Sequence, residues 1–96
     1  MAKGYWIAHV TVTDPSRYPE YQAANAAAFK KYGARFIVRG GESQVVEGSF
    51  KQRHVVIEFD SYEQALACYR SPEYAAALKI RKDIADGDLV IVKGPE

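Results

Sequence analysis

Three ionisable side chains on predicted β-strands have the types needed for acid–base chemistry: His9, Arg39 and Glu58. Alternation along each strand places all three on one face of the expected sheet. A histidine oriented by a carboxylate is a suitable general base. An arginine beside that pair would bind a carboxylate or stabilise a developing oxyanion. The pattern therefore predicts a site in which His9 is the acid or base, Glu58 orients it and Arg39 contacts the anion.

This prediction depends on how the strands pair. It requires His9 and Glu58 to stand level across a parallel pair of neighbouring strands, and a slip of one residue would separate them. The alternative is a structural network in which Arg39 pairs with Glu58 within the sheet or across a dimer, since charges at interfaces are usually paired. Both interpretations stay open at the level of sequence.

Gly40 and Gly41 follow Arg39 directly and are a second candidate for ligand contact. Glycines let backbone amides approach an anion. The alternative, favoured by what glycine pairs usually do in strands, is a bulge that bends a long hairpin. The spacing does not match a dinucleotide-binding fingerprint, because these glycines do not lead into a helix.

Ser71-Pro72-Glu73-Tyr74 marks the start of a helix and is a third candidate. An anion could be held at this helix start, with Tyr74 or Arg81 alongside. Plain capping by Ser71 and a first-turn proline explain the same residues.

Several aromatic side chains would either pack the core or line a pocket between helices and sheet: Trp6, Tyr21, Tyr32, Phe36, Phe59 and Tyr69. Asn25 lies beside the apolar stripe of the first helix and is expected to be solvated or locally hydrogen-bonded. His54 begins a strand and is expected to be exposed. Cys68 has no nucleophile motif around it and is expected to be a buried, inert thiol.

Hydrophobic periodicity predicts the elements that position these residues. Strands are expected over residues 5–12, 34–39, 53–59 and 89–92, and residues 44–47 would extend the second strand beyond the glycines. The first helix begins near Pro19 and ends at Gly33. The second begins at Ser61, breaks near Arg70 and ends at 86–88. This β-α-β-β-α-β order predicts a single ferredoxin-like α+β domain over residues 1–96, with a four-stranded antiparallel sheet in the order 4-1-3-2 and both helices on one face.

Length and composition indicate how such a domain gains stability. A chain of 96 residues buries a limited share of its surface. One cysteine and two histidines exclude an intrachain disulfide and give no structural zinc site, so no metal is expected. Oligomerisation remains. Apolar residues on the open sheet face, including Ile7, Ile37 and Val56, would need cover, and a second copy of the chain would supply it.

Charge and hydropathy exclude other classes of protein. A net charge of +1 without a basic block argues against nucleic-acid binding. No apolar run approaches the roughly 20 residues of a membrane helix. The N-terminus lacks the apolar region of a signal peptide, so a cytoplasmic protein is expected.

Nearly the whole chain resembles the small bacterial family catalogued only as domain of unknown function thirteen-thirty. The similar features are the tyrosine-rich first helix ending in Tyr32-Gly33, Phe36-Ile37-Val38-Arg39-Gly40-Gly41, Glu47-Gly48, Val56-Ile57-Glu58-Phe59, Ser71-Pro72-Glu73-Tyr74 and Arg81. The resemblance implies a dimeric α/β barrel, in which two ferredoxin-like sheets pack face to face. Relatives in the wider superfamily include cofactor-free monooxygenases, muconolactone isomerases and haem-dependent enzymes, while the family itself has no settled activity.

Two classes of function follow. The first is a small-molecule binder or enzyme acting without a cofactor on a small organic acid or aromatic metabolite, through His9, Glu58 and Arg39 with Gly40, Gly41, Ser71, Tyr74 and Arg81 as further candidates. The second is a non-catalytic structural or interaction homodimer, in which the same residues serve the interface. The sequence leaves open whether the protein is an enzyme.

Overall fold

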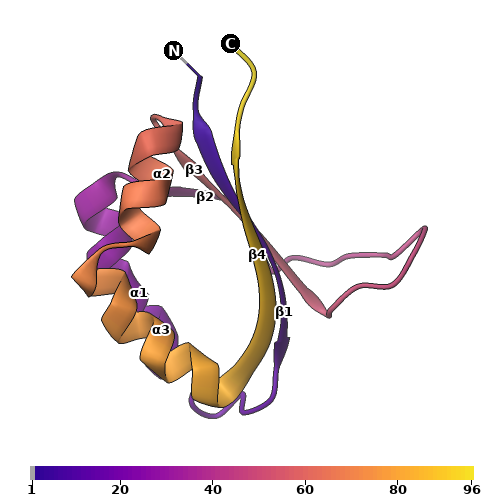
Figure 1. Ribbon diagram of the computed structural model, residues 1–96. Coiled ribbons are helices and arrows are strands. Elements are labelled where there is room, and N and C mark those ends of the chain that lie inside the picture. Colours follow the sequence, from indigo (N-terminus) through magenta and orange to yellow (C-terminus); the bar gives the residue numbers. More distant parts are fainter. Residues whose placement is uncertain (1) are drawn as a thin grey trace.

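Four strands form one antiparallel sheet, and three helices cover one of its faces (Figure 1). This computed structural model describes residues 2–96. The elements are β1 Gly4–Val12, α1 Tyr18–Tyr32, β2 Arg35–Arg39, β3 Arg53–Phe59, α2 Tyr62–Tyr69, α3 Pro72–Ile84 and β4 Ala85–Lys93. The strand order is β2-β3-β1-β4, and every neighbouring pair is antiparallel. The predicted ferredoxin-like α+β fold is therefore confirmed, including the break in the second helical segment.

The core lies between the sheet and the helices, where β1 alternates as its sequence predicts. Trp6 and Val10 are buried on the helix side, whereas Ile7 and His9 are half-buried on the other face. The indole N–H of Trp6 donates to the carbonyl oxygen of Ala65 in α2 at 2.8 Å. A buried indole donor needs such a partner, so this bond fixes α2 on the sheet.

Local signals place the helix ends. Gly33 adopts a left-handed φ of 68° after α1, as predicted for a glycine terminator. Ser71 caps α3, because its Oγ accepts from the N–H of Tyr74 at 3.1 Å and donates to the carbonyl oxygen of Cys68 at 2.6 Å. None of the helices within residues 2–96 has the length and apolar character to cross a membrane.

The end of α3 differs from the prediction. Residues 86–88 were expected to end the helix, but α3 ends at Ile84 and all three lie within β4. β4 pairs with β1 along the full length from Gly4 to Val12. The hydrogen bonds of this long ladder therefore override the turn preference of the Asp-Gly-Asp sequence.

Residues 40–52, which we call the arm, connect β2 to β3. Figure 1 shows the arm projecting from the sheet on the side away from the helices. The predicted strand over residues 44–47 is wrong, since these residues adopt no regular structure. They are exposed, and within residues 2–96 no strand lies beside them that could supply the hydrogen-bond partners of a β ladder. Val45, Val46 and Phe50 of the arm are exposed apolar residues.

Gly4 provides a test of how closely β1 approaches α2. A Cβ at this position would lie 2.6 Å from both Ser61 O and Tyr62 Cα. Because backbone atoms cannot move aside cheaply, we expect Gly4→Ala to lower the free energy of unfolding by about 1–3 kcal/mol in urea denaturation. The control Gly41→Ala adds a Cβ with no atom within 4 Å and should leave stability near wild type. Equal stability of the two variants would contradict this packing.

Candidate functional site

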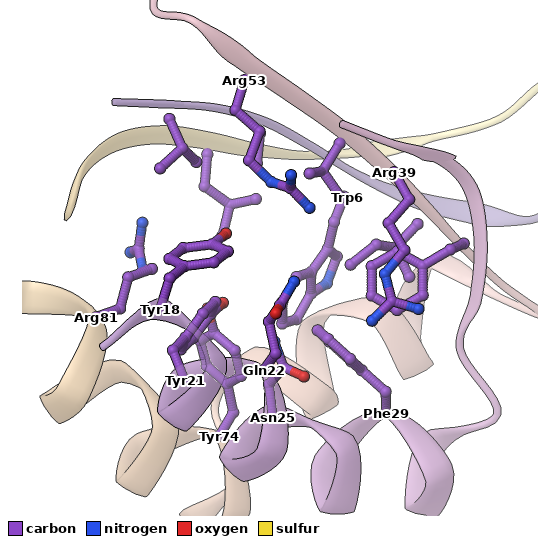
Figure 2. A pocket seen from close by; sticks show the side chains of 16 residues that line it. Trp6, Tyr18, Tyr21, Gln22, Asn25, Phe29, Arg39, Arg53, Tyr74 and Arg81 are labelled. Carbon is purple, nitrogen blue, oxygen red and sulfur yellow. The ribbon is translucent and has the colours of Figure 1, made fainter. Parts of the chain in front are cut away.

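A cavity lies between the helix-facing side of the sheet and the helices α1 and α3 (Figure 2). The part of the cavity that a water-sized sphere can enter has a volume of about 40 Å³. The total empty space, which includes the solvent at the open mouth, has a volume of about 520 Å³. Its apolar lining is Trp6, Ala8, Val10, Phe29, Phe36, Val55, Ile57 and Leu89. Its polar lining is Tyr18, Tyr21, Gln22, Asn25, Arg39, Arg53, Tyr74 and Arg81. A mostly apolar cavity with a few polar groups is typical of small-molecule sites.

Three arginines carry positive charge into this cavity without an acidic partner. Arg39 and Arg53 extend from the sheet and Arg81 from α3 (Figure 2). The lining includes no aspartate or glutamate, and within residues 2–96 none of the three arginines forms an ion pair. The Nε atoms of Arg53 and Arg81 are buried without a hydrogen-bond partner. The cavity is therefore electrostatically suited to an anion.

Glycines make room for two of these guanidinium groups. A Cβ on Gly40 would collide with Nη1 and Cζ of Arg53, and a Cβ on Gly87 would lie 2.6 Å from Nη1 of Arg81. The N–H of Gly40 donates to the carbonyl oxygen of His54 at 2.9 Å and is thus occupied. These contacts support the alternative in which Gly40 bends the chain between β2 and β3. The N–H of Gly40 is not a free donor for an anion.

Tyrosine hydroxyls and an amide lie at the base of the cavity. The hydroxyl oxygens of Tyr21 and Tyr74 are 2.7 Å apart. Burial raises the pKa of both hydroxyls, so both stay protonated at neutral pH. One of them donates to the other, which leaves one hydroxyl proton of the pair for a ligand. Asn25 was expected to be solvated or locally hydrogen-bonded; it is not solvated but buried in the lining beside Tyr21. Its burial is explained by the polar groups around it, since a buried amide needs partners.

Arg39 points to the opposite face from the one predicted. A bulge between Phe36 and Val38 shifts the alternation of β2 by one residue. Arg39 is consequently paired with Val55, whose side chain faces the helices, and its Cζ lies 4.1 Å from the centroid of the Phe36 ring. The predicted common face of Arg39 with Glu58 is therefore wrong, for the reason that a slip of one residue reverses side-chain direction.

His9 and Glu58 are also not brought together. The parallel pairing that this site required is wrong, because β1 and β3 are antiparallel, with His9 opposite His54 and Tyr5 opposite Glu58. The hairpin between β2 and β3 reverses the chain, so β3 cannot run parallel to β1. Instead of being simply exposed, His54 is half-buried, and its Nδ1 lies 2.9 Å from Nδ1 of His9.

Glu58 is bound by residues other than Arg39. Nε of Arg35 donates to Oε1 of Glu58 at 3.1 Å, and the hydroxyl of Tyr5 donates to Oε2 at 3.1 Å. The same guanidinium reaches Oδ1 of Asp60 at 3.0 Å. The expected Arg39–Glu58 ion pair is thus replaced by an Arg35–Glu58 pair on the open face.

The remaining candidates divide between the cavity and the scaffold. Tyr74 and Arg81 line the cavity, whereas Ser71 is engaged as a helix cap, and Gly41 is exposed in the arm and is not part of the lining. Arg53 was missed by sequence reasoning. Its position two residues before the buried Val55 was the available signal, because a charge on the apolar side of a strand is unusual.

Cysteine chemistry and metal binding gain no support in the described chain. Burial raises the pKa of Cys68 to about 12, and its thiol is fully buried, in keeping with the expected inert thiol. Within residues 2–96, no three histidine, cysteine or acidic side chains are gathered in a way that could hold a metal ion.

Comparisons with known proteins place this geometry in context. The family model described as "Domain of unknown function (DUF1330)" matches residues 3–95. No curated protein matches the sequence.

Solved structures share the fold at low sequence identity. A protein of unknown function from Rhodopseudomonas palustris is 17% identical with a TM-score of 0.77, over 99% of this chain and 84% of that one. SnoaB, a cofactor-independent oxygenase from Streptomyces nogalater, is 11% identical with a TM-score of 0.65, over 100% and 96%. A dimeric ferredoxin-like protein of unknown function from Thermobifida fusca is 18% identical with a TM-score of 0.52, over 99% and 92%.

The Arg35–Glu58 pair predicts a pH-dependent contribution to stability. The hydrogen bond from Arg35 holds the pKa of the Glu58 carboxyl below its ordinary value. A lowered pKa means that this stabilisation is present above the unfolded-state pKa and is lost as the pH falls through the folded-state pKa. We therefore expect Glu58→Gln to lower the Tm at pH 7, with a difference from wild type that narrows below about pH 4.

Glu63→Gln is the matched control, because Glu63 is exposed on α2 and forms no ion pair within residues 2–96. Thermal melts of both variants are measured across pH 3–8. If the Tm of Glu58→Gln differs from that of wild type by the same amount as the Tm of Glu63→Gln at every pH, the pairing is contradicted.

Proposed function

Since this chain belongs to the DUF1330 family, whose description assigns no activity, we propose that its cavity binds a small organic acid with an apolar or aromatic body. The ligand's apolar part would lie on the floor formed by Trp6, Ala8 and Ile57. Its carboxylate would meet Arg39 at the mouth. This proposal keeps the predicted ligand class and the predicted role of Arg39, but moves the site to the helix side of the sheet.

The observation that carries the proposal is the unpaired positive charge of Arg39 beside an aromatic wall. Its guanidinium lies over Phe36, which in turn packs edge-on against Phe29 at a centroid distance of 5.4 Å. Arginine on an aromatic face presents its N–H groups in a planar fork that matches a carboxylate. With no acid in the lining, a ligand's carboxylate would supply the missing counter-charge.

We propose further that any chemistry at this site proceeds without a cofactor, by stabilising charge that develops on the bound acid. The amide of Asn25 and the one hydroxyl of the Tyr21–Tyr74 pair that does not donate to its neighbour are preorganised donors at the cavity base. The shared fold with a cofactor-independent oxygenase supports this class of reaction. His9 and Glu58 play no part in the proposal, because both lie on the opposite face of the sheet.

Arg39→Ala tests the site. In a thermal-shift screen against small organic acids and aromatic acids, a compound at about 100 times its Kd adds roughly 2.7 kcal/mol of apparent stability to wild type. We expect Arg39→Ala to abolish most of this shift. Arg35→Ala is the matched control, since Arg35 lies four residues earlier on β2 but pairs with Glu58 on the open face. A compound that stabilises both variants equally would contradict the proposed contact.

The open sheet face supports a second proposal, a homodimer. One residue from each strand forms an apolar row across the sheet: Val38, Val56, Ile7 and Val90. Val38 and Val90 are exposed in the single chain.

Polar cross-strand neighbours flank the row, with Asp88, His9 and His54 on one side and Tyr5 and Glu58 on the other. An apolar centre with a polar rim is the usual anatomy of an interface, and a second copy of the same face would fit it. The dimer is compatible with a ligand site on the helix side. If no ligand binds, we propose that the protein acts as a non-catalytic structural or interaction homodimer.

Val56→Asp tests the dimer. An unpaired carboxylate in the middle of the apolar row would be costly to desolvate, so we expect a monomer by light scattering. Ala76→Asp places the same charge on the exposed surface of α3 and should leave the mass unchanged. If Val56→Asp keeps the mass of a dimer, the open faces do not form the interface.

A further inference from the structure

Arg39 and Arg53 extend from neighbouring strands into the same edge of the cavity. Arg39 on β2 is level with Val55 on β3, and Arg53 precedes Val55 by two residues, so both arginines face the helices. Such diagonal neighbours on paired strands lie roughly 7–8 Å apart, a separation that long side chains can span. The guanidinium of Arg53 also lies against Gly40, the residue that follows Arg39. Two positive charges are therefore gathered at the β2 edge of the cavity.

Arg81 belongs to a different part of the cavity. Its guanidinium lies against Gly87 on β4, and β1 lies between β4 and β3 in the sheet. Two strand spacings, roughly 10 Å, thus separate β4 from β3. Figure 2 shows the side chain of Tyr18 between those of Arg53 and Arg81. One acidic group bound by Arg53 can therefore be shared with Arg39 and not with Arg81.

Arg39 and Arg53 are each held in place by an aromatic ring. The Cζ atom of Arg39 lies 4.1 Å from the centroid of the Phe36 ring, and that of Arg53 lies 5.4 Å from the centroid of the Tyr18 ring. A guanidinium that stacks on a ring keeps its N–H groups available for acceptors in its own plane. Neither arginine forms an ion pair within residues 2–96, where the Nε atom of Arg53 is buried without a hydrogen-bond partner. An unsatisfied buried donor costs free energy until an acceptor arrives.

We infer that Arg39 and Arg53 form one clamp, and that the acidic group it fits best is a dianion with three oxygens, the phosphoryl group of a monoester. This inference rests on the proposed function, which requires only one acidic group at Arg39. It adds Arg53 as the residue that decides which kind of acid binds most tightly.

Charge and the number of acceptors favour a phosphoryl group over a carboxylate. A carboxylate brings one negative charge and two oxygens, whereas a phosphomonoester brings close to two charges at neutral pH and three strong acceptor oxygens. The lining contains no aspartate or glutamate that could neutralise a second guanidinium. A carboxylate would leave one of the two arginines without a counter-charge, and a phosphoryl group would supply both. Its three oxygens can also accept from the two planar forks of N–H groups at once.

Three small probes test the clamp by calorimetric titration: phenyl phosphate, methyl phenyl phosphate and benzoate. The titrations are run near pH 7.5, above the second pKa of about 6 of a phosphomonoester. Methyl phenyl phosphate is the matched control, because it keeps the phenyl body and the phosphorus but has one negative charge and one free oxygen fewer. We expect phenyl phosphate to bind wild type about tenfold more tightly than its methyl ester, the size of effect that one charge-assisted hydrogen bond provides. It should also bind more tightly than benzoate.

Variants assign this preference to residues. Arg53→Gln should lower the ratio of the affinities for phenyl phosphate and its methyl ester from about tenfold toward one, because it removes the second half of the clamp. Arg39→Gln should weaken the binding of all three probes. Arg81→Gln is the matched control, since it removes the same charge from the other edge of the same cavity and should leave the ratio unchanged. Both affinities come from one preparation of each variant, so a loss of folded protein does not change their ratio.

Two results would overturn the clamp. One is a wild type that binds methyl phenyl phosphate as tightly as phenyl phosphate. The other is a ratio that falls in Arg81→Gln and not in Arg53→Gln. If benzoate nevertheless binds wild type and not Arg39→Gln, the proposed organic-acid function stands without the clamp.

Inorganic phosphate decides the case in which no organic acid binds. It should raise the Tm of wild type and of Arg81→Gln, and raise that of Arg39→Gln and Arg53→Gln far less. This pattern without binding by any organic acid would keep the clamp and overturn the proposed organic-acid function. Equal stabilisation of all four proteins by phosphate, or stabilisation of none, would then overturn the clamp as well.

Discussion

The indole of Trp6 is the contact on which the arrangement of sheet and helices depends. Its N–H binds the backbone of α2, and its ring packs within 5.7 Å, between centroids, of aromatic rings from α1, α2, α3 and β3. Because this large side chain fills one end of the space between the layers, the helices are held off the sheet beside it. The next residue on the same face, Ala8, is small, and the cavity opens above it.

The two faces of the sheet then differ in how they treat charge. On the open face, Glu58 is satisfied by Arg35 and Tyr5, and polar rows enclose an apolar one. On the helix side, Arg39, Arg53 and Arg81 have no acidic partner within residues 2–96. The net charge of +1 does not indicate that paired charges lie on one face of the sheet and unpaired arginines on the other. The paired face is suited to meet another protein surface, and the unpaired one is suited to a small anion.

Much of the fold was predictable because its signals are local. Alternation in β1 gave the two faces of the strand, Gly33 gave the end of α1, and Ser71 with Pro72 gave the break before α3. Each of these depends on residues within a few positions of one another. The strand order followed as well, since right-handed crossovers leave few alternatives for this sequence of elements.

The sequence by itself determined the order of the helices and strands, the sheet order and the kinds of side chain available for a site. The tertiary structure alone decided which of them meet. The bulge that turns Arg39 toward the helices and the antiparallel register that sets His9 against His54 both arise from hydrogen bonds between strands distant in the chain. The same pairing brings residues 86–88 into β4 and sets Arg53 beside Gly40. Local patterns cannot encode these positions, because a shift of one residue costs little locally and reverses every side chain beyond it.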